Sequence, residues 1–485
     1  MLFNSYVLIF LFLPITVFGY FMFNKLRNNN FAKVWLVLCS FFFYAYFNFS
    51  YFWIILSSIV VNYVLSLLMM KTFKEKKLLK RILLSLGLFL NIGVLFFYKY
   101  LDFVFECVSN IFNTDPVYMG LILPLGISFF TFQQVSYLVD SYKGNSKIYN
   151  VIDYSLFVTF FPQLIAGPVV LHSEVIPQFE DQSNRKFNID NFAKGIYVFS
   201  SGLAKKVLIA DNFGKIVSFG YGNIGDLSSF EAILTVFAYT IQIYFDFSGY
   251  CDMASGISYM FNIELPINFN SPYKAKNISD FWKRWHITLT RFLTSYIYIP
   301  LGGSRCSLAR SCFNVFIVFL VSGIWHGAGY TFIVWGLMHG IAMIFYKIFK
   351  NSVDKIPSAI TWSLTFIFVN LTWVYFRALT ISEANLLLSR IFSGGFTLNY
   401  EITETLLNII PISIVTNILD FEWTLNVVIV LATAFFIAVC VLMPNIQEKA
   451  KQYKPKLSNL LTTVIMFLWS VFSLSGVSTF LYFNF

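Results

Sequence analysis

Long apolar stretches alternate with short polar segments along the whole chain of 485 residues. About 20 apolar residues in a helix cross the hydrocarbon of a bilayer. The pattern therefore predicts an all-α membrane protein with about eleven to thirteen spanning helices. The predicted spans are residues 2–23, 34–49, 52–70, 82–101, 119–139, 192–210, 230–247, 313–325, 331–349, 361–376, 425–443 and 460–481.

One region departs from this pattern. Between residues 149 and 179, a short apolar stretch is interrupted by Pro162, Gly167, Pro168 and Pro177. Non-helical backbone at membrane depth is tolerated only where protein or a water-filled cavity satisfies its amides. We therefore predict a re-entrant element beside a cavity. No linker separates it from the rest, so we expect one embedded domain, with N-terminal helices (1–140), a motif-bearing core (141–345) and C-terminal helices (346–485).

The polar loops predict the orientation of the chain. Basic residues follow the first and third spans, most densely at 71–81, whereas the loops at 102–117 and 401–422 contain acids and no Lys or Arg. Short basic loops stay in the cytoplasm. We therefore expect the basic loops inside and the acidic loops outside. The net charge of +10 comes from such loops and not from one basic patch, which argues against nucleic acid as a partner.

Composition agrees with a membrane protein. Apolar and aromatic residues make up 58% of the chain and charged residues only 12%, too few to cover a water-facing surface. The 59 Phe and 28 Tyr suit contact with membrane lipid. The first stretch lacks a basic start and a cleavage site, so we expect a retained span rather than a signal peptide. Six Cys without CxxC pairing and four His without HExxH predict neither a disulfide framework nor a metal site.

The densest polar segment covers residues 271–310. We predict a helix that begins near Asp280, capped by Asn277 or Ser279, with Trp282 and His286 on one face. One interpretation is an interfacial helix anchored by its basic face and its tryptophans. The other is a cytoplasmic platform for a phosphate-rich donor or an acidic carrier protein. The candidate donor-binding residues of this segment are Trp282, Trp285, Lys283, Arg284 and Arg291.

A second polar segment, SGIWHGAG at residues 322–329, joins two apolar runs. An ionisable residue inside a membrane is costly, which makes His326 a candidate for function, with Trp325 beside it. A neutral imidazole can take a proton from an attacking hydroxyl, and the glycines allow another chain or a substrate to approach the ring. The alternative is a buried histidine bonded to a backbone carbonyl. We expect His339 to be a core histidine.

Two acids end a long apolar run, at Asp246 and Asp252. Buried acids need partners, and we expect structural ion pairs with Arg284 or Arg291 rather than catalysis. Asp246 is nevertheless retained as a candidate substrate-binding residue.

Several long motifs resemble the membrane-bound O-acyltransferase superfamily, and within it the bacterial alginate O-acetylation group. They are LPLGISFFTFQQVSYLVD (123–140), FPQLIAGPV (161–169), YFDFSGYCDMASG (244–256), the run at 265–305 with FWKRWH, SGIWHGAGYTFIVWGLMHG (322–340), and the ending FLYFNF. The resemblance implies a ring of tilted helices around a pore. It also implies an essential role for His326 and a second catalytic role for His286.

The resemblance further implies a reaction. We expect transfer of an acetyl group from acetyl-CoA or an acyl-carrier thioester in the cytoplasm to hydroxyls of an exported polysaccharide, with His326 as general base and no bound cofactor. Delivery is either direct or through an extracytoplasmic, hydrolase-like partner protein at the bacterial cytoplasmic membrane. The alternatives are D-alanyl transfer to teichoic acid and, from another class, a transporter of polysaccharide or lipid-linked sugar. A transporter predicts pseudo-symmetric halves, which the sequence lacks.

Overall fold

The computed structural model describes residues 1–26, 30–72, 76–395, 422–474 and 480–481, with only the backbone described at 422–429. Within these ranges every regular element is a helix, as the apolar pattern predicts. The N-terminal helices are α1 (Leu13–Asn24), α2 (Asn30–Ala45), α3 (Phe49–Lys71), α4 (Lys77–Lys99), α5 (Leu101–Phe112) and α6 (Ile127–Lys143).

The middle of the chain forms short, mostly buried helices around one long helix. They are α7 (Val151–Thr159), α8 (Phe161–Leu164), α9 (His172–Glu180), α10 (Ile189–Ala204), α11 (Asp211–Gly222), α12 (Ser229–Met260), α13 (Ile278–Trp282) and α14 (Ile287–Leu293). The proline-interrupted region therefore breaks into α7, α8 and α9, as expected, and none of these three is long enough to span a membrane.

The C-terminal third contains long apolar helices together with two shorter, more polar ones, α18 and α22. They are α15 (Leu308–His326), α16 (Tyr330–Val353), α17 (Ser358–Arg377), α18 (Ile381–Ser393), α21 (Glu422–Leu442), α22 (Ile446–Lys451) and α23 (Leu457–Phe472). The acidic loop predicted at 401–422 lies, except for its last residue, outside the described residues, as does most of the FLYFNF ending.

The described residues contain six helices long and apolar enough to cross a membrane: α3, α4, α12, α15, α16 and α17. Four shorter apolar helices lie at Leu8–Asn24, Asn30–Ala45, Val430–Leu442 and Leu457–Phe472. The expected count of eleven to thirteen full spans is therefore not reached here. At the predicted span 119–139, for example, α6 begins only after Pro124 and the left-handed Gly126 (φ 71°), because these two residues interrupt the helix.

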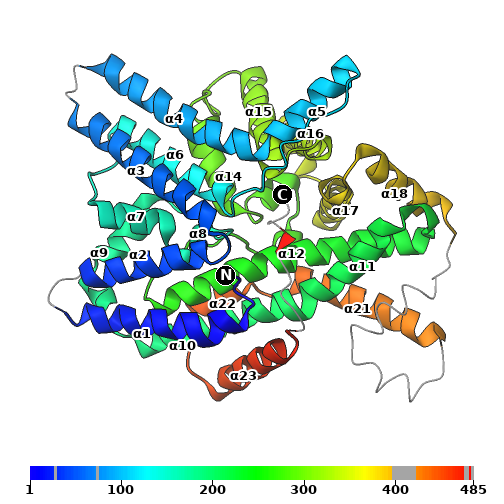
Figure 1. Ribbon diagram of the computed structural model, residues 1–485. Helices are drawn as coiled ribbons and strands as arrows, with labels where there is room; N and C mark the ends of the chain where they lie inside the picture. The colour runs from blue at the N-terminus through cyan, green and yellow to red at the C-terminus, as the bar shows by residue number, and fades with distance from the viewer. Residues whose placement is uncertain (27–29, 73–75, 396–421, 475–479, 482–485) are drawn as a thin grey trace.

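α12 crosses the middle of the molecule, and the N-terminal end of the chain lies near it (Figure 1). The rings of Phe3 and Phe480 both pack on Tyr250 of α12, with centroids 4.8 and 4.6 Å away. α10 packs closely along α12 through facing glycines. A Cβ atom at Gly202 would lie 2.6 Å from the carbonyl oxygen of Gly249, so only glycine allows these helix backbones to approach so closely.

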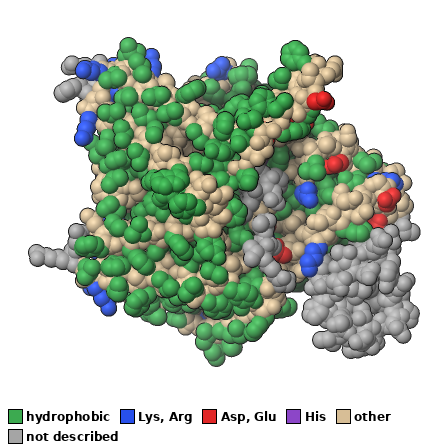
Figure 2. Space-filling model, viewed as in Figure 1, with side chains coloured by type: hydrophobic (Ala, Val, Ile, Leu, Met, Phe, Trp, Pro, Cys, Tyr) green, Lys and Arg blue, Asp and Glu red, His purple; other side chains and the backbone are tan. Residues whose placement is uncertain are grey.

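Charged side chains are unevenly distributed over the surface. The visible face is largely hydrophobic, its left edge carries Lys and Arg, and its right half carries the visible acidic side chains together with further Lys and Arg (Figure 2). α4 starts at the basic loop with Lys77 and ends at Lys99. α5 follows it, and Tyr330 at the start of α16 contacts Phe103 and Cys107 of α5. On the expected orientation, in which the basic loop lies in the cytoplasm, the start of α16 lies on the outer side and its end on the cytoplasmic side. We name the two sides of the molecule outer and inner on this expectation.

Candidate functional site

His326 is the last residue of α15 and is buried, with 2% of its surface exposed. Aromatic rings enclose its imidazole. Ring centroids of Trp325, Trp335 and Phe376 lie 5.0, 5.0 and 5.2 Å away. The ring of His286 lies 6.3 Å away. The structure therefore brings together two of the histidines that the sequence singled out.

His286 separates α13 from α14 and adopts a left-handed backbone conformation (φ 44°, ψ 52°). The prediction of one helix carrying Trp282 and His286 on a shared face is therefore wrong, although Asn277 does cap α13 through the amide of Asp280. A non-glycine residue in this conformation costs about 1–2 kcal/mol. A long-range hydrogen bond offsets this conformational cost, because the amide of Ile287 donates to the carbonyl of Asn268 at 2.9 Å.

Asn268 also orients the ring of His286. Its Oδ1 lies 3.2 Å from Nδ1 of His286, and it accepts hydrogen bonds from the amide and the hydroxyl of Thr288 at 3.2 and 2.8 Å. An oxygen that accepts these bonds requires a donor in the ring. The network therefore assigns the proton to Nδ1 and makes Nε2 the basic nitrogen of His286.

α15 is held against α16 by two facing glycines, Gly323 and Gly336. A Cβ atom at Gly323 would lie 2.5 Å from the carbonyl oxygen of Phe332, and one at Gly336 would lie 2.6 Å from the carbonyl oxygen of Phe319. We expected glycines near His326 to admit another chain or a substrate. At Gly323 the approaching chain is α16, which brings Trp335 to the imidazole.

The end of α15 is closed by Lys99, the last residue of α4, and by Tyr100, which follows it. The hydroxyl of Tyr100 donates to the carbonyl of Ile324 at 2.9 Å. Nζ of Lys99 donates to the carbonyls of Trp325 and His326 at 2.6 and 3.1 Å. These bonds satisfy carbonyls that a helix end leaves without an intrahelical partner.

Two cavities lie on either side of this centre. The outer cavity has a volume of about 40 Å³ and includes Lys99, Gly126, Ser128, Trp325 and His326 in its lining. It lies at the start of α6 and at the end of α4 that precedes the acidic loop.

The inner cavity is larger, about 750 Å³, and opens near the cytoplasmic end of α16. Its lining includes Trp282, Lys283, Phe319, Ser322, Lys347 and Lys350. Ser322 is buried and lies one helical turn before His326, on the same face of α15. The inner cavity thus combines a basic mouth with a largely apolar interior that ends one turn from the imidazole.

The inner cavity is lined by two of the predicted donor-binding residues, Trp282 and Lys283. The others are not among its described lining residues. Trp285 is 1% exposed and packs on Trp373, with centroids 4.9 Å apart. Trp282 is also buried. These tryptophans are core residues, so the interpretation as an interfacial helix is wrong. Neither Arg284 nor Arg291 is among the described residues that line the inner cavity.

Both arginines belong to ion pairs. Arg284 pairs with Asp280 four residues earlier, with Nε 2.9 Å from the carboxylate. Arg291 forms a two-pronged pair with Glu174 of α9. The Arg291 pair therefore fastens α14 to α9, whereas the Arg284 pair is local to α13 and the residues that follow it.

The buried acids of α12 have lysine partners. Asp246 pairs with Lys206 and Asp252 pairs with Lys205, each at 2.6 Å. The predicted pairing with Arg284 or Arg291 is therefore wrong, because those arginines have nearer acids. The prediction of structural ion pairs agrees with this arrangement, and Asp246 lines neither the inner nor the outer cavity in the described part of the chain.

The two remaining histidines are held in the core. Nδ1 of His339 accepts from Nε1 of Trp282 at 3.3 Å, and Nε2 lies 3.0 Å from the hydroxyl of Thr372. His172 lies 3.0 Å from the hydroxyl of Tyr149 and 3.3 Å from Asp140. Among the described residues, no group of three His, Cys, Asp or Glu side chains could hold a metal ion.

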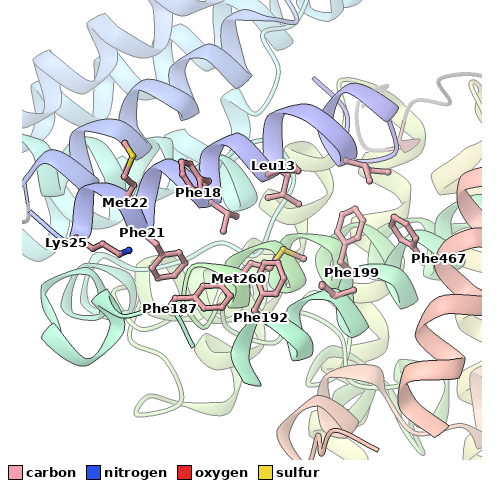
Figure 3. A pocket seen from close by; sticks show the side chains of 14 residues that line it. Leu13, Phe18, Phe21, Met22, Lys25, Phe187, Phe192, Phe199, Met260 and Phe467 are labelled. Carbon is pink, nitrogen blue, oxygen red and sulfur yellow. The ribbon is translucent and has the colours of Figure 1, made fainter. Parts of the chain in front are cut away.

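A third cavity, of about 660 Å³, lies between α1 and α10 (Figure 3). Lys25 lies at one end of it and Phe467 at the other, with aromatic rings between them. Its described lining contains no histidine and, besides Lys25, no ionisable side chain. The described lining of this cavity is therefore apolar apart from Lys25.

Sequence reasoning missed Lys99, Asn268 and Lys347. A signal existed for Lys99, because a lysine inside a predicted span is itself unusual. Lys347 gave the same signal, since it lies within the predicted span 331–349. Asn268 gave no such signal, because its role depends on which segments meet in three dimensions.

Comparison with known proteins supplies independent evidence. Residues 121–382 match the model of the membrane-bound O-acyltransferase (MBOAT) family. A peptidoglycan O-acetyltransferase of Helicobacter pylori is 47% identical over 414 residues, which is 79% of this chain and 78% of that protein. A protein of Pseudomonas aeruginosa named "Probable alginate O-acetylase AlgI" is 35% identical over 401 residues, 81% of this chain and 75% of its own length.

A less similar relative is named for another activity. A teichoic acid D-alanyltransferase of Bacillus subtilis is 28% identical over 240 residues, covering 48% of this chain and 61% of that protein.

Proposed function

Because the chain belongs to the membrane-bound O-acyltransferase family and is a multi-pass membrane enzyme, we propose that it moves an acetyl group from a cytoplasmic thioester to hydroxyls of an exported polysaccharide. We place it in the bacterial cytoplasmic membrane, since the relatives named above are bacterial. The hydroxyl acceptor belongs to a cell-surface polymer, the type of substrate that the names of those relatives print.

The position of His326 carries this proposal. The imidazole lines the outer cavity, and Ser322 of the inner cavity lies one turn away. A thioester entering from the basic inner mouth and a hydroxyl entering from outside would therefore approach the same ring. The two substrates would meet there without either crossing the whole membrane.

His326 acts as the general base in this mechanism. As the acceptor hydroxyl attacks the acyl carbonyl carbon, its proton passes to the imidazole and a new C–O bond forms. The C–S bond then breaks, and the departing thiolate takes the proton back from the imidazolium. Atoms and charge balance, and the products are an ester and a free thiol. The buried ring of His286, held by Asn268, acts beside it as the second catalytic histidine.

The inner cavity suits the donor. Lys283, Lys347 and Lys350 give its mouth positive charge, which attracts the phosphates of coenzyme A or of a carrier-protein prosthetic group. The aromatic interior with Trp282 and Phe319 suits the less polar arm that leads to the thioester. The acetyl group either goes directly to the polymer or first to an extracytoplasmic partner protein.

Acetyl transfer is favoured over D-alanyl transfer by the extent of the similarity. The two O-acetylating relatives match 79% and 81% of the chain, whereas the D-alanyltransferase of Bacillus subtilis matches 48%. A transporter would need no imidazole between two cavities.

The test is the O-acetyl content of surface polymers in cells that carry His326→Asn, measured as acetate released by mild alkali. We expect complete loss of the acetate that depends on this chain, with the variant inserted at normal levels. His172→Asn is the matched control, since His172 is a buried histidine outside both cavities, and its activity per inserted molecule should remain. Unchanged acetylation in the His326 variant would refute the mechanism.

A further inference from the structure

Lys99 is a cationic side chain at the reaction centre to which the mechanism above gives no role. It ends α4, a helix apolar enough to span the membrane. Its Nζ lies 2.6 Å from the carbonyl oxygen of Trp325 and 3.1 Å from that of His326. An ammonium group at such a position is costly, and ionisable residues inside membranes usually serve function.

The capping of carbonyl groups at the end of α15 does not by itself explain why a charged side chain, that of Lys99, lies there. Tyr100, the next residue, caps the carbonyl of Ile324 with a neutral hydroxyl. An ammonium has three N–H donors, and the two carbonyls take two of them. The side chain of Lys99 also lines the outer cavity, so its third donor is available to a group in that cavity.

The outer cavity favours negative charge. Its described lining contains no Asp or Glu. Besides Lys99 it includes Gly126, Ile127 and Ser128 at the start of α6, where backbone amides carry a partial positive charge. Its volume of about 40 Å³ holds roughly two or three water-sized groups. That space fits an acetyl group and not a long acyl chain.

We propose that Lys99 is a further catalytic residue, which donates a hydrogen bond to the oxygen of the acyl carbonyl while His326 activates the acceptor. This inference rests on the proposed function. When the hydroxyl oxygen bonds to the carbonyl carbon, the C=O π electrons move to the carbonyl oxygen, and Lys99 stabilises that oxyanion. The electrons return as the C–S bond breaks. Lys99 remains protonated throughout, so the proton balance stays with His326.

The matched pair Lys99→Met and Tyr100→Phe separates this role from simple capping. Both variants remove hydrogen bonds to the same end of α15, but only Lys99 lines the outer cavity. The full-length protein is assayed in membranes that contain the native acceptor, with acetyl-CoA as the donor probe. The measurements are kcat and KM from the release of free thiol, together with the thermal midpoint of each variant.

We expect Lys99→Met to lower kcat by about 10²–10³, the usual effect of removing one oxyanion donor, with KM for acetyl-CoA within about twofold of wild type. Tyr100→Phe should lower kcat by less than about threefold, with a similar change in thermal midpoint. Equal losses of kcat in the two variants, or wild-type kcat in Lys99→Met, would overturn the inference. A wild-type protein that consumes no acyl thioester would instead refute the proposed function, and the inference with it.

Discussion

The rings of His286 and His326 lie with centroids 6.3 Å apart, although they come from different helices. Each is positioned by a different set of contacts. Asn268 orients His286 through its Nδ1, whereas α16 and the segment that ends α4 hold the helix end that carries His326. The effects of substitutions in the contacts of His286 should therefore be separable from the effects of substitutions in the contacts of His326.

Replacing Asn268 tests the orientation of His286. Asn268→Leu removes the oxygen that Nδ1 faces, so we expect kcat to fall about 10-fold to 100-fold, less than the usual loss when an acid–base group itself is removed. Asn268→Asp keeps an acceptor oxygen and should retain most of the activity. The measurement is kcat for thiol release from acetyl-CoA, and equal losses in both variants would contradict a role through the acceptor oxygen.

The contact between α15 and α16 predicts a stability effect at Gly323. A Cβ atom there would lie 2.5 Å from a backbone oxygen, so Gly323→Ala must separate the helices and should destabilise the protein by about 1–3 kcal/mol. Gly93→Ala in α4 is the control, because no atom lies within 4 Å of the added Cβ. It should be neutral or stabilising by up to about 1 kcal/mol. Thermal unfolding in detergent compares the two, and equal stability would show that α15 and α16 can separate without cost.

The mouth of the inner cavity predicts an effect on donor affinity. Lys283 lines the cavity, whereas its neighbour Arg284 pairs with Asp280. We expect Lys283→Gln to raise KM for acetyl-CoA about threefold to fivefold, as the loss of one exposed charge contact implies. Arg284→Gln should raise KM less than Lys283→Gln, because Arg284 lies outside the described lining, although its partner Asp280 belongs to it. The difference should shrink at high salt, because exposed charges are screened, and a larger effect at Arg284 would place the donor elsewhere.

The buried pair Lys206–Asp246 predicts a non-additive effect. Lys206→Met leaves the carboxylate of Asp246 buried without its cation and should cost about 3–5 kcal/mol. The double variant with Asp246→Leu should cost less than Lys206→Met alone. Lys147→Met removes the exposed pair with Glu180 and should cost less than about 1 kcal/mol. Unfolding measurements on wild type, the two single variants, the double variant and Lys147→Met test this. A double variant as unstable as the sum of its single variants would contradict the pairing.

The sequence predicts the helical membrane fold well, because span length and apolar content depend on local composition. The broken region around Pro162 and the cap at Asn277 are local signals too, and the structure contains both. His326 stood out because a histidine inside a span is rare.

The failures concern long-range contacts. No local signal places a left-handed residue at His286, since the hydrogen bonds that hold it come from Asn268. Likewise, the choice of Lys206 over Arg291 as the partner of Asp246 depends on how η3 (Lys205–Ala210) packs on α12. Pattern and spacing give candidates for a site, whereas only the assembled fold decides which of them meet.

The attachment of α4 to the end of α15 bears on how much of the chain an active enzyme requires. The family model begins at residue 121, yet Lys99 and Tyr100 precede it and hold the backbone at and before His326. The segment that ends α4 therefore contributes contacts to the proposed site and does not serve for membrane attachment alone. A truncated protein that starts at residue 121 would retain the part that the family model matches. It would still lack Lys99, which lines the outer cavity beside His326.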